Sequence, residues 1–598
     1  MSEKNLSEQL SRRKRSGVTV PLFCVYSKES LGIGELNDLR LVIDWANKTG
    51  NSIIQLLPLN ELGALFCPYD SISSFALEPA YISLEKVPAA KNNSFKEKIA
   101  LIREKFPSGT PYVDYRIKRE KINFLWEIFL EDRELHSPEF HRFKEENAYW
   151  LRDFALYKTL KGSQEEKPWY EWEEKYKNRD ARSLESFRNE HAEEVLFQKW
   201  LQWQLYRQFK EVKKYALAKK TLLKGDLPIL VSRDSADVWQ HPEFFQLEYA
   251  AGAPPDAYAA RGQRWGMPTY NWARIATDGY KYLREKLKYA ENFYDILRID
   301  HVVGLFRIWS IRYNEPLENK GLRGFFEPKG EQVWGEHGRN LLKVIREYTR
   351  MFLCAEDLGV IPEICPETLK ELGIPGNDVQ RWVKDWKVKH DFLPPGGYRR
   401  LSVAMLSTHD TTNWPAWWEN EAGTIDEALF IRKCSDQRQI DFKAAEEKLF
   451  DATRSAHGRL RWQENVDSVD KLVAILGKKR EELGDFIDLY ENSYQEKEKF
   501  WKHLGIAGPM REKCDNEIIR AALKITLDSN SLFCINTIID WLYPADIFPG
   551  DAYQYRFNTP GTISEKNWSL TLPISLEELL KHEVTEEIKR MVVASGRT

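Results

Sequence analysis

Phe293-Tyr-Asp-Ile-Leu-Arg-Ile-Asp300 is an apolar segment that ends in charged residues. Its short length and branched side chains favour a buried β-strand. Residues 278–290, which precede it, have the pattern of a helix. A helix that leads into an apolar strand with a polar carboxyl end is typical of the repeating unit of a parallel α/β sheet.

The same pattern recurs along most of the chain. About eight strand-like runs can be counted, and amphipathic helices such as residues 36–49, 197–216 and 340–350 lie between them. The clearest strand-like runs are residues 17–25, 51–58, 221–231, 293–300, 351–357, 402–410 and 532–539. The count favours a (β/α)8 TIM barrel. A doubly wound open sheet is the alternative, because it also binds ligands at the carboxyl ends of its strands.

Two long segments interrupt this alternation. Residues from about 86 to 196 and from about 415 to 530 are charged and have helical periodicity, and the first is neither Gly/Ser-rich nor poor in apolar residues. We therefore expect two large helical insertions rather than linkers. Residues 1–16 are polar and are expected to form a flexible tail, so the catalytic unit is expected to span residues 17–598.

The composition narrows the class of protein. The 598 residues carry 88 Lys+Arg and 91 Asp+Glu, and this mixed charge, −3 in total, does not indicate nucleic-acid binding. No signal peptide or membrane span is expected, because the N-terminus lacks an apolar h-region and no run of about 18 apolar residues occurs. Seven scattered cysteines without a Cys-x-x-Cys pair favour a reducing, cytoplasmic compartment. The 21 Trp and 26 Tyr fit stacking against sugar rings, or a large aromatic core.

Charged residues gather at the ends of three predicted strands, in Arg298-Ile-Asp300-His301, Ala355-Glu356-Asp357 and Ser407-Thr-His409-Asp410. Cleavage of a glycosidic bond needs one carboxylate and one carboxylic acid that face each other across the anomeric carbon. Arg298 lies two residues before Asp300, and its charge is expected to lower the pKa of that carboxyl, as a nucleophile requires. Asp357 is expected to raise the pKa of Glu356 toward that of a general acid.

Other interpretations of these residues remain open. An Asp at a strand end can be a helix cap, and His301, His409 and the acids could bind a metal. No His-x-His or His-Glu-x-x-His spacing supports a metal site, so none is expected. Gly32-Ile-Gly34 is too short for a nucleotide-binding loop and there is no P-loop, so no cofactor is expected either.

The sequence resembles the amylomaltase family of 4-α-glucanotransferases from about residue 17 to about residue 570. The resemblance rests on an ordered set of motifs: Leu31-Gly-Ile-Gly34, Leu56-Leu-Pro-Leu59, Pro68-Tyr-Asp-Ser71, Gly225-Asp-Leu-Pro228, Asp234-Ser-Ala-Asp-Val-Trp239, Pro254-Pro-Asp256, Gly262-Gln-Arg-Trp-Gly266, Arg298-Ile-Asp-His301, Ala355-Glu-Asp-Leu-Gly359 and Thr408-His-Asp410. In motif detail it is closest to the plant cytosolic disproportionating-enzyme branch. The starch-binding modules of that branch are not expected here, because the resemblance to the barrel starts at about residue 17.

The resemblance implies a retaining, two-step transfer of α-1,4-linked glucosyl or maltosyl units. It implies that Asp300 is the nucleophile, Glu356 the acid and then the base, and Asp410 the group that grips the distorted donor sugar. The residues that it implies for sugar binding are Tyr69, Asp226, Asp256, Tyr258, Gln263, Trp265, Arg298, His301 and His409. The implied partners are maltooligosaccharides, maltose, glucose and a glycogen-like glucan.

Two other functions use the same residues. An α-glucan hydrolase would use the same acids, and transfer requires in addition that a bound sugar hydroxyl outcompetes water. The loop with Tyr258, Trp265, Tyr270 and Trp272 is expected to provide that acceptor site; ordinary packing of these rings is the less favoured alternative. A catalytically inactive glucan-binding protein is disfavoured, because all three acidic positions are retained.

Overall fold

The structure is a computed structural model that describes residues 8, 10–256, 259–436 and 440–598. The described residues contain an eight-stranded parallel sheet with the strand order β11-β8-β3-β2-β1-β18-β15-β12. Its strands are β1 (Arg15–Thr19), β2 (Ile53–Gln55), β3 (Leu222–Leu227), β8 (Ile296–Ile299), β11 (Phe352–Ala355), β12 (Gly376–Val379), β15 (Ser402–Met405) and β18 (Phe533–Thr537). Around this sheet each strand neighbours the next barrel strand in the sequence, and β18 returns to β1.

The two end strands of the sheet meet and close it into a barrel. Ala355 N, on β11, donates to Pro375 O, directly before β12, at 2.8 Å. Arg399 also spans this seam, because it donates to Asp357 at 2.6 Å and to Asp378 at 2.7 Å. The expected (β/α)8 barrel is therefore confirmed.

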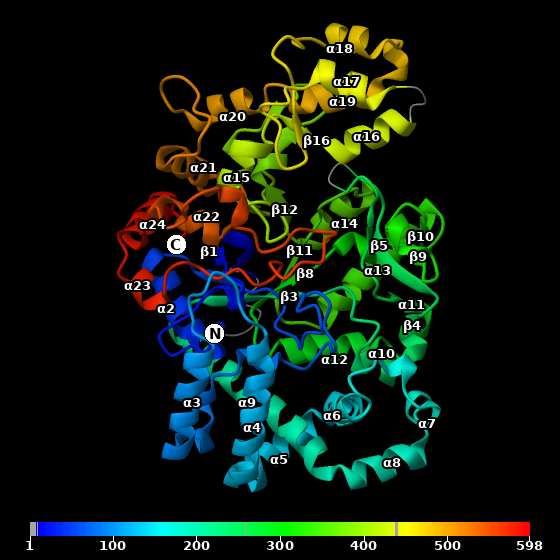
Figure 1. Ribbon diagram of the computed structural model, residues 1–598, viewed down its shortest axis with the longest axis vertical. Helices are drawn as coiled ribbons and strands as arrows, with labels where there is room; N and C mark the ends of the chain where they lie inside the picture. The colour runs from blue at the N-terminus through cyan, green and yellow to red at the C-terminus, as the bar shows by residue number, and fades with distance from the viewer. Residues whose placement is uncertain (1–7, 9, 257–258, 437–439) are drawn as a thin grey trace.

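Helices cover the outside of the barrel (Figure 1). They include α2 (Leu39–Thr49), α9 (Ala192–Ala218), α12 (Lys281–Ala290), α13 (Glu331–Glu347), α14 (Ile364–Leu372), α21 (Asn516–Asp528) and α24 (Glu583–Ala594). Short helices are α10 (Ala236–Gln240), α11 (Trp272–Ala276), α22 (Ile538–Leu542) and α23 (Leu576–Leu579). None of the helices in the described part of the chain is both long and apolar enough to cross a membrane.

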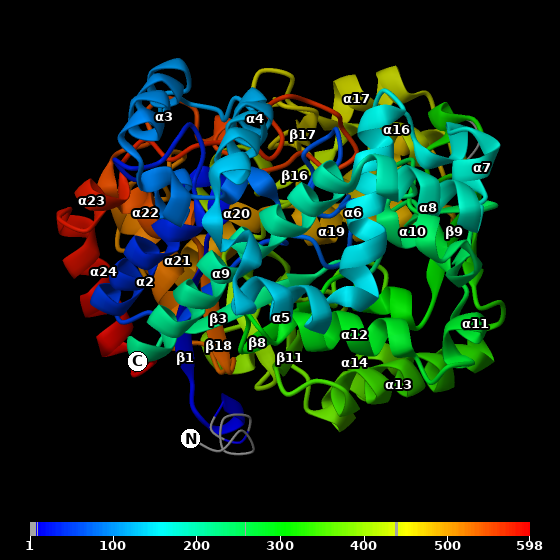
Figure 2. The ribbon, with the colours of Figure 1, turned by 90° about the horizontal axis from the view of Figure 1, so that it is seen from below.

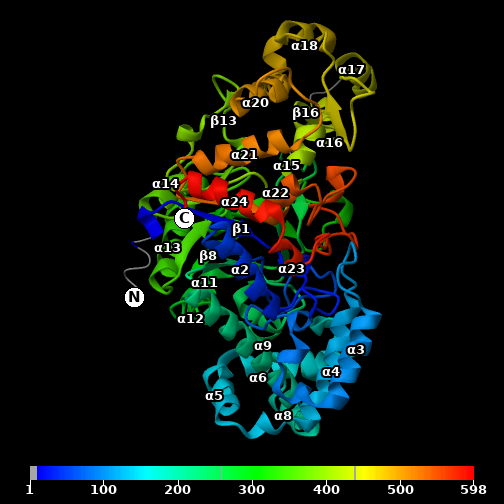
Figure 3. The same cartoon turned by 90° about the vertical axis from the view of Figure 1, so that its left-hand side faces the viewer.

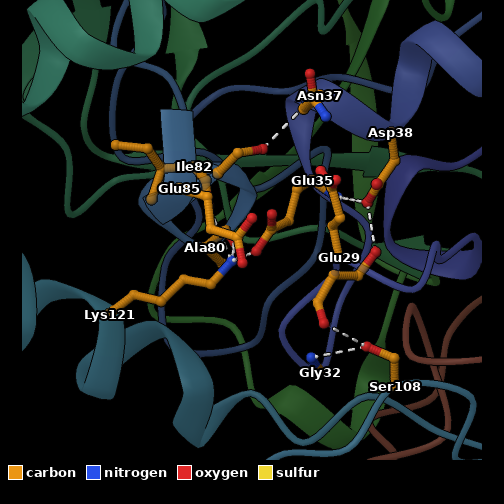
Figure 4. A network of polar contacts seen from close by, with 12 residues as sticks. Glu29, Gly32, Glu35, Asn37, Asp38, Ala80, Ile82, Glu85, Ser108 and Lys121 are labelled. Atoms are coloured by element: carbon orange, nitrogen blue, oxygen red, sulfur yellow. Dashed lines mark hydrogen bonds and ion pairs between the residues drawn. The ribbon is translucent and has the colours of Figure 1, made fainter. Parts of the chain in front are cut away.

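The first insertion is helical, and it lies on one side of the barrel (Figure 1). It contains α3 (Asn93–Lys105), α4 (Arg116–Glu131), α5 (Pro138–Glu146), α6 (Ala148–Ser163), α7 (Glu174–Lys177), α8 (Ala181–Glu190) and the start of α9. Lys121 of α4 is fully buried, and its ammonium donates to Glu35 at 2.6 Å, to Ala80 O at 2.8 Å and to Ile82 O at 3.0 Å (Figure 4). The ion pair ties the insertion to the loops that follow β1 and β2.

The second insertion lies at the opposite end of the molecule from the first (Figures 1 and 3). It contains α15 (Trp414–Ala416), α16 (Glu427–Asp436), α17 (Phe442–Leu449), α18 (Val469–Leu476), α19 (Gly484–Ser493) and α20 (Glu496–Leu504), with the hairpin β16 (Thr424–Asp426) and β17 (Arg459–Arg461). Phe430, Phe450, Trp462 and Phe486 belong to a hydrophobic cluster of its own.

A separate antiparallel sheet includes β9, the strand that follows β8 in the sequence. Its strands are β5 (Tyr249–Ala253), β6 (Gln263–Arg264), β9 (Ile308–Arg312) and β10 (Gly324–Glu327). Small two-stranded pairs are β4 (Phe245–Gln246) with β7 (Thr269–Tyr270), and β13 (Lys384–Asp385) with β14 (Asp391–Phe392). The segment between β5 and β7, which includes β6, contains the predicted acceptor-side residues: Asp256 and Tyr258 precede β6, Gln263 belongs to it and Trp265 follows it.

The N-terminal segment joins the barrel slightly before the predicted boundary. Arg15 and Ser16, which the prediction assigns to the tail, already belong to β1. Leu10 is buried in a cluster with Ile53 and Phe533. Beyond Thr19 the predicted strand 17–25 does not continue, because residues 22–24 form a 3-10 turn. Figure 2 shows residues 10–14 leading into the amino end of β1.

Candidate active site

The guanidinium of Arg298 lies among three carboxylates at the carboxyl ends of neighbouring strands. Arg298 on β8 pairs in register with Asp226 on β3, and its Nη1 donates to both oxygens of Asp226 at 2.7 and 2.6 Å. The same Nη1 donates to Asp300 Oδ1 at 2.9 Å. Arg298 Nη2 is 4.0 Å from Glu356 Oε2. One buried positive charge therefore interacts with carboxylates from three strands.

Backbone bonds hold Glu356 beside the end of β8. Glu356 N donates to Ile299 O at 2.9 Å, and Glu356 O accepts from Val302 N at 3.1 Å. The side-chain oxygen Oε2 accepts from His301 N at 2.7 Å. His301 has a φ of 42°, in the left-handed region, and this turn directs its N–H to the carboxylate. The local backbone of β8 thus fixes Glu356 beside Asp300.

Burial controls the protonation of the two acids. Burial raises the pKa of Glu356 to about 7, against the lowering effect of Arg298. Burial also raises the pKa of Asp300, to about 6, although Arg298 lowers it. The expectation that Arg298 lowers the pKa of Asp300 below its usual value is therefore wrong, because desolvation outweighs the guanidinium. The pKa of Glu356 is still higher than the pKa of Asp300, so Glu356 is the weaker acid of the two.

Asp357 does not have the expected role of raising the pKa of Glu356. Its carboxylate accepts from Asn377 N at 2.6 Å and from Arg399 Nη1 at 2.6 Å, so it helps to close the barrel at β12. The raised pKa of Glu356 comes first from burial and not from this neighbour. Adjacent residues of a strand point to opposite faces, which explains the difference.

Asp410 forms a second charged pair beyond the end of β15. His409 Nε2 lies 3.2 Å from Asp410 Oδ2, and Asn558 Nδ2 donates to Asp410 Oδ1 at 2.8 Å. Burial would raise the pKa of Asp410, but His409 and Asn558 outweigh it and lower the pKa to about 2. The side chain is nevertheless 46% exposed, so an ionised carboxylate faces the site.

Tyr69 connects the two charged groups. Its hydroxyl donates to Asp226 Oδ2 at 2.8 Å, and its ring stacks on His409 with centroids 5.1 Å apart and planes at 15°. The ring of Trp568 lies 5.9 Å from Tyr69 and 6.0 Å from His409. The three rings form an aromatic wall beside the acids.

Comparisons with known proteins show the family of this chain. Residues 20–576 match the family model described as 4-alpha-glucanotransferase. A 4-alpha-glucanotransferase of Chlamydia pneumoniae is 32% identical over 575 residues, 95% of this chain and 93% of that protein. The 4-alpha-glucanotransferase DPE2 of Oryza sativa subsp. japonica is 35% identical over 68% of this chain and 58% of that protein. The solved amylomaltase from Streptococcus agalactiae, in complex with acarbose, superposes with a TM-score of 0.69 at 20% identity, over 98% of this chain and 100% of that one.

The chain belongs to the 4-α-glucanotransferase family.

The segment between β5 and β7 brings Trp265, a further predicted residue of this glucanotransferase, next to His301. Trp265 meets His301 edge to face, with centroids 4.9 Å apart at 87°. Trp265 Nε1 donates to Gln263 Oε1 at 3.0 Å, which orients both side chains. Asp256, which precedes β6, accepts a hydrogen bond from Ala259 N at 2.7 Å. Tyr258 lies outside the described residues.

Burial keeps His301 of the glucanotransferase neutral. It lowers the pKa of His301 to about 4, and the charge of Arg298 acts in the same direction. Burial would also lower the pKa of His409, but the neighbouring Asp410 raises it above the usual value. Across the described residues, no group of three or more His, Cys, Asp or Glu side chains is arranged to hold a metal ion.

Two residues of this site in the glucanotransferase are not among those predicted from the sequence. Asn558 and Trp568 come from the segment between α22 and α23, which follows the last barrel strand. The run Asn558-Thr-Pro-Gly561 predicts an ordinary turn, so its Asn carried no separate signal. Trp568 is one of 21 tryptophans, and only the fold shows that it reaches Tyr69 and His409.

Proposed function

We propose that this 4-α-glucanotransferase works by retaining double displacement, with Asp300 as nucleophile and Glu356 as acid and base. One observation carries the proposal: Asp300 and Glu356 share the guanidinium of Arg298, at 2.9 and 4.0 Å. An acid of higher pKa beside a carboxylate of lower pKa is the pair that glycosyl transfer requires.

In the first step an oxygen of Asp300 attacks C1 of the donor sugar. The bond between C1 and the glycosidic oxygen breaks, and Glu356 gives its proton to that departing oxygen. The products are a glycosyl ester on Asp300, an ionised Glu356 and a shortened glucan. Arg298 orients the attacking oxygen and favours its ionised form.

In the second step Glu356 acts as a base. It takes the proton of an acceptor hydroxyl, whose oxygen bonds to C1 while the bond from C1 to Asp300 breaks. This restores both acids and leaves the configuration at C1 as it was in the donor. Water in place of the acceptor would give hydrolysis, so the outcome depends on which of the two occupies the acceptor side.

The remaining residues fit the recognition of one donor sugar. The exposed oxygens of Asp410 are ionised and can accept hydrogen bonds from ring hydroxyls, with His409 beside them. Tyr69 offers a flat face at which sugar C–H groups can pack. Asp226 holds both Arg298 and Tyr69, so it acts by orienting them. His301 supplies the backbone N–H that holds Glu356.

The loop segment between β5 and β7 is proposed to hold the acceptor. Trp265 contacts His301, which follows the nucleophile, and Gln263 is bonded to Trp265. An aromatic side chain here would bind an acceptor sugar and exclude water. We assign Asp256 and Tyr258 to the same loop function. A hydrolase would not need this second sugar site, and so the loop favours transfer.

We propose maltooligosaccharides and maltose as donors, and glucose or a glycogen-like glucan as acceptors. The seven cysteines form no disulfide and six of them are buried, which supports a reducing, cytoplasmic site of action. Residues 17–598 are proposed to act as one catalytic unit, because both insertions pack onto the barrel.

Incubation with maltotriose alone tests the function. Transfer gives glucose together with a ladder of longer maltooligosaccharides, whereas a hydrolase gives only shorter products. The variant Asp300→Asn should bind glucan and produce neither. A loss of activity on addition of a chelator would contradict the two-carboxylate mechanism and favour a metal-dependent hydrolase.

A further inference from the structure

The loop between α3 and α4 of the first insertion lies against the segment that carries Trp568. Val113 N donates to Ser569 O at 2.7 Å, and Thr571 N donates to Pro111 O at 3.0 Å. Tyr115, directly before α4, donates its hydroxyl to Trp568 O at 2.5 Å. Residues 111–115 thus run beside residues 568–571 and hold that segment from outside the barrel.

Trp568 needs such a support. Its φ is 60°, in the left-handed region that a bulky residue rarely adopts. A backbone of this kind is strained and persists only where neighbouring groups fix it. Trp568 N donates to Phe557 O at 2.6 Å, and its carbonyl is held by Tyr115. These bonds direct the ring of Trp568 toward Tyr69 and His409. Trp568 is only 5% exposed.

Tyr115 also contacts the loop that carries Tyr69. Its ring stacks on Phe66, with centroids 4.0 Å apart and planes at 16°. Phe66 has a φ of 51° and lies three residues before Tyr69. Lys118, one turn into α4, donates to Leu62 O of the same loop at 3.1 Å. One tyrosine of the insertion therefore joins both chain segments that form the aromatic wall.

We propose that Tyr115 is a positioning residue for the donor-sugar site. It acts through Trp568 and Phe66, and it fixes the distance and tilt of the rings that receive the sugar. The inference rests on the proposed function, in which Tyr69 and His409 bind the donor. The inference also gives the first insertion a role, since its Tyr115 joins two segments that are about 500 residues apart in the sequence.

The variant Tyr115→Phe tests the inference, because it removes the hydroxyl and keeps the ring that stacks on Phe66. One neutral hydrogen bond is worth about 0.5–1.5 kcal/mol, so we expect kcat/KM for maltotriose to fall roughly 2- to 10-fold. The KM for glucose as acceptor should stay unchanged. A general loosening of the fold would change both constants. Tyr112→Phe is the matched control, because its hydroxyl makes no hydrogen bond to any residue that the structure describes.

Phe66→Leu is the second variant, and it removes the stack while the hydroxyl bond remains. This variant should also lower kcat/KM for maltotriose and leave the KM for glucose unchanged. Wild-type donor kinetics in both variants, or equal changes in donor and acceptor constants, would overturn the inference. A failure of the proposed function is a separate result, because the wild-type enzyme itself would then give no longer products from maltotriose.

Discussion

Glu356 and Asp300 occupy matching positions on adjacent parallel strands. Ala355 of β11 pairs in register with Ile299 of β8, and each of the two acids is the next residue along its strand. Neighbouring strands lie about 4.8 Å apart, close to the spacing of about 5–5.5 Å between the carboxyl groups of retaining enzymes. The register of the barrel therefore sets the spacing of the two acids.

The variant Glu356→Gln should lose transfer from maltotriose by roughly 10²- to 10⁴-fold, because the departing sugar oxygen can no longer receive a proton. With α-glucosyl fluoride as donor the first step should be much less affected, since fluoride leaves without a proton. Stopped reactions with each donor measure the difference. Equal losses with both donors would contradict the assignment of Glu356 as the acid.

The pH dependence of kcat/KM should be a narrow bell. Asp300 must be ionised, and its pKa is raised to about 6, so activity should be lost as the pH falls through that value. Glu356 must be protonated, and activity should be lost as the pH rises through about 7. The two limbs report the coupled pair. An alkaline limb that persists in Glu356→Gln, measured with the fluoride donor, would assign it to another group.

The variant Asn558→Ala should reduce kcat/KM for maltotriose by roughly 10- to 100-fold, because a hydrogen bond to a charged group contributes about 1.5–3 kcal/mol. Asn558 donates to Asp410, and without it that carboxylate loses both orientation and one cause of its low pKa. Steady-state kinetics give the effect. Asn178→Ala, an exposed surface change, is the control and should match the wild type.

The variant Trp265→Ala should shift the reaction from transfer toward hydrolysis. An aromatic contact contributes about 0.5–1.5 kcal/mol, so the ratio of free glucose to longer products should rise roughly 2- to 10-fold. Product chromatography after incubation with maltotriose measures this ratio. Trp386→Ala, on the exposed hairpin between β13 and β14, should leave the ratio unchanged. An unchanged ratio in Trp265→Ala would show that the segment containing Trp265 does not bind the acceptor.

The variant Lys121→Met should lower the free energy of unfolding by about 3–5 kcal/mol, because it leaves Glu35 buried without its partner. Denaturant unfolding followed by circular dichroism measures the loss. Lys105→Met is the control, since its pair with Glu120 is exposed and should contribute less than about 1 kcal/mol. Similar losses in the two variants would show that burial of the Lys121 pair does not matter.

The barrel and its catalytic rim were predictable, because most strands are apolar runs that end in charge. β12 was not, since Gly376-Asn-Asp-Val379 contains two polar residues. Both are buried: the backbone of Asn377 donates to Asp357 and accepts from Arg399, and the carboxylate of Asp378 accepts from Arg399 and Ser402. A strand whose polar groups find partners only in the folded barrel has no apolar signature in the sequence.

The same limit applies to the site. The acids, Arg298 and Tyr69 lie in recognisable motifs at strand ends, so their grouping could be predicted. Asn558 and Trp568 come from an irregular segment, and their approach to Asp410 and Tyr69 depends on how that segment folds back. The balance between burial and Arg298 at Asp300 also requires the three-dimensional environment.

The guanidinium of Arg298 lies between the two acids of the reaction. In the proposed first step Asp300 gives up its negative charge to form an ester while Glu356 acquires one by losing its proton. The anion thus passes from one neighbour of Arg298 to the other, and the total charge around the guanidinium is the same before and after. The cation therefore serves as a fixed counterion throughout the cycle, and little reorientation of the surrounding dipoles is required as the sugar is captured and released.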